Sequence, residues 1–134
     1  MAVNGSGRKT VIVNILMIED NPQFAFLTSK YLKISPLFKS DIVIHQSLGE
    51  GLKYLENNKA DIILLDLHLP DSEGIDTVSS VRSAVPDIPV IVLTSLDDED
   101  VANEAIKKGA QEYIIKTDLT ADSLSKTILY AIER

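Results

Sequence analysis

Short apolar runs alternate with amphipathic segments along this chain. Residues 11–18, 62–66 and 90–95 are almost continuously apolar, a pattern typical of strands buried on both faces of a parallel sheet. Two shorter segments, residues 41–46 and 113–116, are also predicted to be strands. The apolar run that begins at residue 62 leads directly into Asp66, so this carboxylate is expected where a buried strand ends.

Helical periodicity separates these strands. Apolar residues recur at helical spacing in five segments, residues 22–34, 48–57, 75–85, 96–108 and 121–132. Asn21 precedes a proline, which is a favourable helix start, and Ser47 and Glu50 have the spacing of a capping box. The residues expected on the inward face of the first helix are Phe24, Leu27, Tyr31 and Ile34. Regular alternation of strand and helix predicts an α/β fold, a parallel sheet with helices on both faces.

The composition limits the classes of function. The chain has 134 residues, which suits one domain of ordinary size. Thirteen basic residues against 20 acidic ones give a net charge of −7, which argues against nucleic-acid binding and suits a domain that holds cations. The absence of cysteine excludes disulfides and thiolate metal sites, and no apolar run approaches the roughly 20 residues of a membrane span. Residues 1–10 are polar, and we expect a flexible leader or residues added for expression there, with the domain at residues 11–134.

Side chains able to do chemistry follow four of the predicted strands. Glu19 and Asp20 follow the first, Asp66 ends the third, Thr94 lies at the end of the fourth and Lys116 ends the fifth. Because the carboxyl ends of parallel strands meet at one edge of a sheet, these groups are expected to share one rim. Neighbouring carboxylates repel one another, so Lys116 and a hard divalent cation with oxygen ligands are expected among them.

This set of groups predicts a Mg²⁺-assisted phosphoryl site. Mg²⁺ typically takes one or two carboxylates together with phosphate oxygens, and a carboxylate can itself be the nucleophile that forms an aspartyl phosphate. A metal ion and the Lys116 ammonium would neutralise the charge of the transferring group, and the Thr94 hydroxyl would bond the attached group.

From about residue 14 to residue 134 the chain resembles the receiver domain of two-component response regulators. The positions that carry the resemblance are Glu19, Asp20, Asp66, Pro70, Gly74, Thr94, Gly109, Ala110, Glu112, Tyr113 and Lys116. The resemblance implies a flavodoxin-like, doubly wound sheet of five strands in the order 2-1-3-4-5. It also implies a signalling domain rather than an enzyme, one that catalyses only its own phosphotransfer and autodephosphorylation.

The resemblance also implies a role for each residue at the rim. Asp66 would be the phosphoacceptor. Asp20 and Asp66 would ligate Mg²⁺, Glu19 would reach the ion mostly through water, and the backbone carbonyl of His68 would complete the protein ligands. Lys116 would contact the phosphate.

A switch and a set of partners follow from the same resemblance. Thr94 would contact the phosphoryl group and act with Tyr113 as the switch pair, changing the surface of the fourth helix, fifth strand and fifth helix. The phosphodonor would be a sensor histidine kinase or a phosphotransfer protein in the cytoplasm. A homodimer is expected through the last helix and the fourth-helix/fifth-strand face, without nucleic-acid or membrane partners.

Two positions depart from the family pattern. The family lysine is often followed by a proline in a cis peptide, whereas Lys116 is followed by Thr117. A cis bond there would cost about 3 kcal/mol, so a trans bond or an altered loop is expected. His68 is unusual at its position, and its ring is expected near the mouth of the site, where it would tune dephosphorylation.

Several alternatives stay open. Glu19 and Asp20 could balance a helix dipole, Tyr113 could be ordinary packing, and the acidic residues 97–100 are expected to be a solvated helix start. An aspartate-nucleophile phosphatase would need a second acid where this chain has His68. A pseudo-receiver would not take phosphate, and a nucleotide-binding flavodoxin-like domain would need glycines that residues 19–22 lack. The apolar last helix without a capping glycine resembles receivers that continue into another region, but a dimerising helix or a stand-alone domain also explains it.

Overall fold

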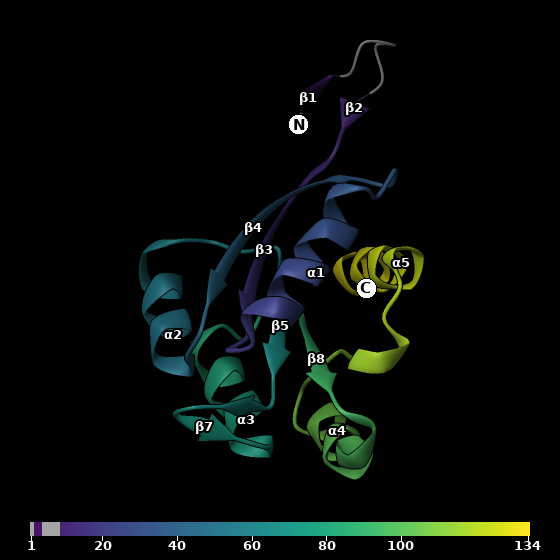
Figure 1. Cartoon of the computed structure of the whole chain (residues 1–134). Helices are drawn as coiled ribbons and strands as arrows, with labels where there is room; N and C mark the ends of the chain where they lie inside the picture. The colour runs from purple at the N-terminus through teal and green to yellow at the C-terminus, as the bar shows by residue number, and fades with distance from the viewer. Residues whose placement is uncertain (1, 4–8) are drawn as a thin grey trace.

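A five-stranded parallel sheet forms the centre of the structure, a computed structural model that describes residues 2–3 and 9–134 (Figure 1). The strands of this sheet are β3 (Ile12–Ile18), β4 (Lys39–His45), β5 (Ile62–Asp66), β8 (Val90–Thr94) and β9 (Glu112–Ile115). They are arranged in the order β4-β3-β5-β8-β9, which is 2-1-3-4-5 when only these strands are counted along the chain. The predicted doubly wound, flavodoxin-like fold is therefore confirmed.

In the described residues, five α-helices cover the two faces of the sheet. They are α1 (Pro22–Lys33), α2 (Leu48–Asn57), α3 (Ile75–Ala84), α4 (Glu99–Lys107) and α5 (Ala121–Glu133). Alternate residues of each strand enter two separate apolar clusters, so that Met17 packs with α1 and α5 while Leu16 packs with α2, α3 and α4. The middle strand β5 is buried along its whole length, as its continuous apolar run predicts.

Short elements complete the chain. Two 3₁₀ turns, η1 (Leu96–Asp98) and η2 (Lys116–Asp118), precede α4 and α5, and β6 (His68–Leu69) pairs antiparallel with β7 (Ser72–Glu73). The leader expected over residues 1–10 lies partly outside the described residues. Its described part contains β1 (Ala2–Val3) and β2 (Lys9–Thr10), which pair antiparallel in a ladder separate from the main sheet.

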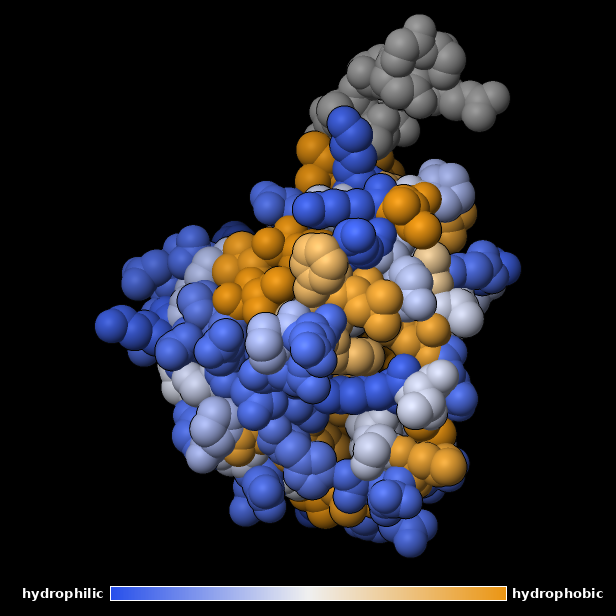
Figure 2. Space-filling view, in the orientation of Figure 1, coloured by the Kyte–Doolittle hydropathy of each residue, from blue (hydrophilic) through white to orange (hydrophobic). Residues whose placement is uncertain are grey.

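The inward face of α1 differs from the expected one. Phe24 and Tyr31 are half-buried against the core as predicted, but Leu27 is 41% exposed and Ile34, which follows the helix, is 71% exposed. The fully inward positions are Ala25, Thr28 and Leu32. Thr28 tolerates burial because its hydroxyl donates to the carbonyl of Phe24 within the helix, at 2.8 Å. Apolar side chains consequently reach the surface over α1 (Figure 2).

Helix starts follow the predicted residues with one addition. Asn21 Oδ1 accepts from the amides of Gln23 and Phe24, and Ser47 Oγ accepts from the amide of Glu50. In the part of the chain that the structure describes, Glu50 does not complete the capping box, and its carboxylate lies 3.6 Å from His45 Nδ1. Asp71 caps the first two amides of the helix: its two oxygens accept from the amides of Leu48 and Gly49, both at 2.9 Å.

The close packing of α2 on β3 provides a test of the fold. A Cβ atom added at Gly51 would lie 2.8 Å from Ile18 Cγ1, so Gly51→Ala should lower the free energy of unfolding by about 1–3 kcal/mol. Gly49→Ala in the same helix is the control, because its Cβ meets only Asp71 Oδ2 at an ordinary 3.4 Å. That variant should stay within about 1 kcal/mol of wild type in urea unfolding. Equal stability of the two variants would contradict this packing.

Candidate functional site

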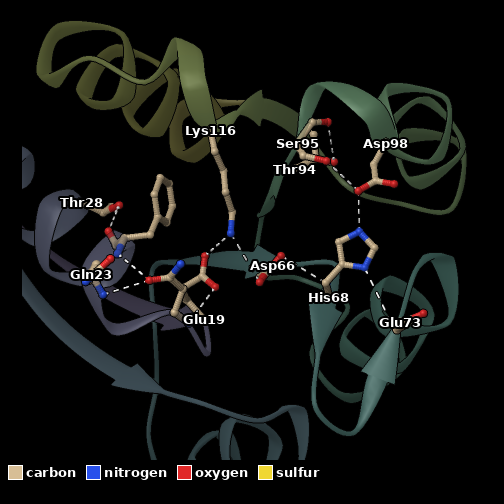
Figure 3. A network of polar contacts seen from close by, with 12 residues as sticks. Glu19, Gln23, Thr28, Asp66, His68, Glu73, Thr94, Ser95, Asp98 and Lys116 are labelled. Carbon is tan, nitrogen blue, oxygen red and sulfur yellow. Dashed lines mark hydrogen bonds and ion pairs between the residues drawn. The ribbon is translucent and has the colours of Figure 1, made fainter.

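The groups predicted at the strand ends do meet at one edge of the sheet. Glu19 and Asp20 directly follow β3, Asp66 is the last residue of β5, and Lys116 directly follows β9. One carboxylate oxygen from each of Glu19, Asp20 and Asp66 lies within 4.8 Å of the others. Figure 3 shows the Lys116 side chain reaching from the opposite side toward Glu19 and Asp66.

The Lys116 ammonium offsets part of the negative charge of the acidic cluster by direct contact with two of its carboxylates. Its Nζ lies 2.6 Å from Glu19 Oε1 and 3.5 Å from Asp66 Oδ2. The ammonium also lies 4.6 Å from the centre of the Phe24 ring, so a cation–π contact with α1 supports its position. Lys116 therefore contacts two of the three acids directly, and Phe24 of α1 supports its position.

Burial divides the three acids into two kinds. Glu19 is 1% exposed and Asp66 is 3% exposed, whereas Asp20 is open to solvent. Burial, reinforced by the neighbouring Asp66, raises the pKa of Glu19 to about 7, and the Lys116 ammonium acts in the opposite direction. The neutral form of Glu19 is thus favoured at this edge, and a further cation would favour its ionised form.

The expected switch residues lie on neighbouring strands. Thr94, at the end of β8, is 1% exposed, and its hydroxyl donates to the carbonyl of Ser95 at 3.3 Å. Tyr113 pairs with Val92 in the sheet, and its hydroxyl donates to Glu99 Oε1 at 3.2 Å. The Tyr113 hydroxyl is therefore bound at the start of α4, and the Thr94 hydroxyl is bound within its own loop.

His68 links the middle strand to the next loop. Its amide donates to Asp66 Oδ1 at 3.1 Å, while its ring Nε2 lies 2.5 Å from Asp98 Oδ2 and Nδ1 lies 3.9 Å from Glu73 Oε1 (Figure 3). The bond to Asp98 raises the pKa of His68 and lowers the pKa of Asp98. These contacts concern the amide and the ring, and the role of the His68 carbonyl as a metal ligand stays a prediction.

Asp98 and Phe24 contribute to this edge in ways that the sequence pattern does not indicate. Asp98 was expected within a solvated helix start, but it is partly buried and bound by His68 and by the Ser95 hydroxyl, the latter at 2.8 Å. Thirty residues separate His68 from Asp98, so no local spacing indicates the pair. The helical periodicity predicts core packing for Phe24, and the structure adds the contact of its ring with the Lys116 ammonium.

Two further expectations concern the backbone and the membrane. The Lys116–Thr117 bond is trans, as are all peptide bonds that the structure describes. Among the described residues, none of the helices is both long and apolar enough to cross a lipid bilayer.

A flavodoxin-like fold with an acid cluster and a lysine at the carboxyl edge of its sheet defines a class of α/β signalling domains. The model of the family described as "Response regulator receiver domain" matches residues 15–128. The chain therefore belongs to the response regulator receiver family, as the resemblance implied.

Individual relatives agree with this assignment. The chain is 37% identical over 118 residues to the luminescence regulatory protein LuxO of Vibrio campbellii, covering 88% of this chain and 25% of that protein. It is 30% identical over 105 residues to the transcriptional regulatory protein MalR of Bacillus subtilis, covering 78% of this chain and 44% of MalR. A receiver domain structure from Clostridium thermocellum superposes with a TM-score of 0.80 at 33% identity, covering 91% of this chain and 95% of that one. The chain thus spans about a quarter of the length of LuxO.

The burial of Glu19 predicts a pH dependence of stability. Its pKa in the folded protein, about 7, lies above the ordinary 4.5, so its contribution to stability is fully present below pH 4.5 and is lost as the pH rises through 7. Without divalent cations, Glu19→Gln should therefore gain about 1–3 kcal/mol of stability relative to wild type between pH 5 and pH 8. Chemical denaturation at several pH values measures this difference. Glu56→Gln, which alters an exposed glutamate of α2, is the control, and the same trend in both variants would refute the assignment.

Proposed function

We propose that this domain accepts a phosphoryl group on Asp66 from a histidine kinase or a phosphotransfer protein in the cytoplasm, with Mg²⁺ bound beside it. The observation that carries the proposal is the position of the Asp66 carboxylate. Its Oδ2 lies 3.5 Å from the Lys116 ammonium, and one of its oxygens lies within 4.8 Å of a carboxylate oxygen of each of the two acids that follow β3, at the edge of the sheet where open α/β folds bind ligands. Membership of the receiver family supports the same chemistry.

The acid cluster fits a magnesium ion. All three side chains offer oxygen, which this hard cation prefers, and ligands on opposite sides of an octahedral Mg²⁺ lie about 4.2 Å apart. The carboxylate oxygens, within 4.8 Å of one another, need only a small inward movement or a bridging water. Asp20 and Asp66 would bind directly, the His68 carbonyl would add a backbone ligand, and Glu19 would act mostly through water. When bound, the ion supplies positive charge for the oxygens of the transferring group.

The transfer itself asks little of the protein beyond position and charge. An Asp66 oxygen attacks the phosphorus of a phosphohistidine, a P–O bond forms, and the P–N bond breaks with its electron pair left on the donor imidazole. Lys116 shifts toward the new phosphoryl oxygens, to which its ammonium, 3.5 Å from Asp66, is already close. Asp66 thus becomes an aspartyl phosphate. Later hydrolysis by water releases inorganic phosphate and restores the Asp66 carboxylate.

Phosphorylation would then change the neighbouring loop. The Thr94 hydroxyl leaves the Ser95 carbonyl for a phosphoryl oxygen, and Tyr113 leaves Glu99 and turns into the space that is vacated. This is a population shift between two states of the α4, β9 and α5 surface. That surface includes exposed Ile106, Tyr130 and Ile132, and it is the face through which we propose partner binding and homodimer formation.

The alternatives receive less support from the same contacts. A phosphatase would need an acid at position 68 to protonate a leaving group, and here the His68 ring is bound to Asp98. A pseudo-receiver would have no need of the assembled pair of Asp66 and Lys116. Neither alternative is favoured by a contact of its own.

Phosphorylation of Asp66 can be tested by intact mass. Wild-type protein incubated with acetyl phosphate and Mg²⁺ should gain the mass of one phosphoryl group, and Asp66→Asn should gain none, because the amide is not a nucleophile for this transfer. Asp118→Asn, an exposed acid in η2 after Lys116, is the matched control and should be labelled like wild type. Labelling of Asp66→Asn at the wild-type rate would rule out this phosphoacceptor.

Magnesium binding can be tested separately. Asp20→Asn removes the exposed acid of the cluster without disturbing the core, and it should weaken Mg²⁺ binding roughly 10- to 100-fold in calorimetry. Asp118→Asn again serves as the control and should bind Mg²⁺ like wild type. If Asp20→Asn kept the wild-type affinity, the cluster would not be the metal site.

A further inference from the structure

Side chains of the β6–β7 hairpin bond to two other elements, the start of α2 and the end of η1. Asp71 accepts from the amides of Leu48 and Gly49 at the start of α2. The His68 ring is bound to Asp98, which ends η1, at 2.5 Å. Because the His68 amide also donates to Asp66 Oδ1, one residue contacts both the nucleophile and the loop that follows Thr94.

The Asp98 carboxylate has two competing uses. It lies at the N-cap position of α4, where an aspartate normally accepts from amides of the first helical turn. In the described structure it caps none of them and is instead bound by His68 Nε2 and by the Ser95 hydroxyl. Release of His68, together with a change of the Asp98 backbone from φ −105° and ψ 19° to the extended region, would allow Asp98 to cap α4.

We propose that the His68–Asp98 pair is a latch that holds the loop after β8 in its unphosphorylated position. The proposal rests on the proposed function of Asp66. Thr94 and Ser95 are adjacent in the chain, and Ser95 is bound to Asp98, so a Thr94 that turns toward a phosphoryl group displaces a loop fastened to His68. When the latch opens, the Asp98 carboxylate exchanges its bond to His68 for bonds to the first amides of α4. Phosphorylation of Asp66 is thereby coupled to the start of α4, which is part of the proposed partner-binding surface.

The latch therefore opposes phosphorylation in the resting state. A ligand shifts an equilibrium between two states by its differential affinity for them, so removal of the latch increases the apparent affinity for any ligand that needs the open loop. The His68 side chain is 48% exposed and that of Asp98 is 25% exposed, and half-exposed ion pairs contribute little. The expected effect is accordingly modest, and the same exposure allows both residues to be changed without loss of the fold.

The test compares His68→Phe and Asp98→Asn with wild type. His68→Phe breaks the latch and leaves Asp98 free to cap α4, while Asp98→Asn keeps a good capping residue and weakens the bond to His68. With beryllofluoride and Mg²⁺ as the probe, both variants should bind about two- to fivefold more tightly than wild type. Asp97→Asn, which alters the adjacent exposed acid, should bind like wild type. The double variant should show no more gain than either single variant.

Amide spectra of the unliganded proteins separate this proposal from the proposed function. In both single variants the signals of Thr94, Ser95 and Asp100 should move in the same direction, and Asp97→Asn should leave the first two at their wild-type positions. If these signals stay in place in His68→Phe and Asp98→Asn, the latch is absent whether or not Asp66 takes phosphate. If wild type binds no beryllofluoride while the signals move, the latch stands and the phosphoacceptor role fails.

Discussion

The contact on which the site depends is the one between the Lys116 ammonium and two buried carboxylates. Glu19 and Asp66 are almost fully buried at the ends of adjacent strands, where like charges repel strongly because little water screens them. Lys116, 2.6 Å from one and 3.5 Å from the other, offsets part of that repulsion, and the pKa of Glu19 is nevertheless raised, first by burial and then by Asp66. The fold therefore maintains a deficit of positive charge at this edge, which is what a site for a metal ion requires.

The sheet could be predicted from the sequence because helices cover both of its faces, and strands buried on both faces consist of continuous apolar runs. Strands such as β5 must be continuously apolar, and that pattern is unambiguous in a short segment ending in Asp66. The face of α1 was harder to predict, since the burial of Thr28 depends on a bond to the Phe24 carbonyl within the helix rather than on hydropathy. Leu27, which is more apolar, remains 41% exposed because it lies off the helix face formed by Ala25, Thr28 and Leu32.

The site was predictable to the extent that topology alone determines it. Parallel strands bring Glu19, Asp66 and Lys116 to one edge whatever the loops do. The contacts of Asp98 and Asp71 depend on how far each loop reaches across that edge, and both carboxylates would pass for ordinary helix-start or turn residues in the sequence. Loop contacts between residues distant in the chain leave no periodic signal, and they are the part that required the structure.

The Phe24 ring beside the ammonium has a consequence for how such a domain can diverge. Position 24 lies in the first turn of α1, near the surface where Phe26 and Leu27 are exposed, so its ring contacts the lysine of the acid cluster and also borders an outer surface. A change of α1 that moves this turn will reposition the ring and with it the charge of Lys116. The outer surface of α1 and the charge balance of the acid cluster are therefore linked through one aromatic side chain, and selection acting on either constrains the other.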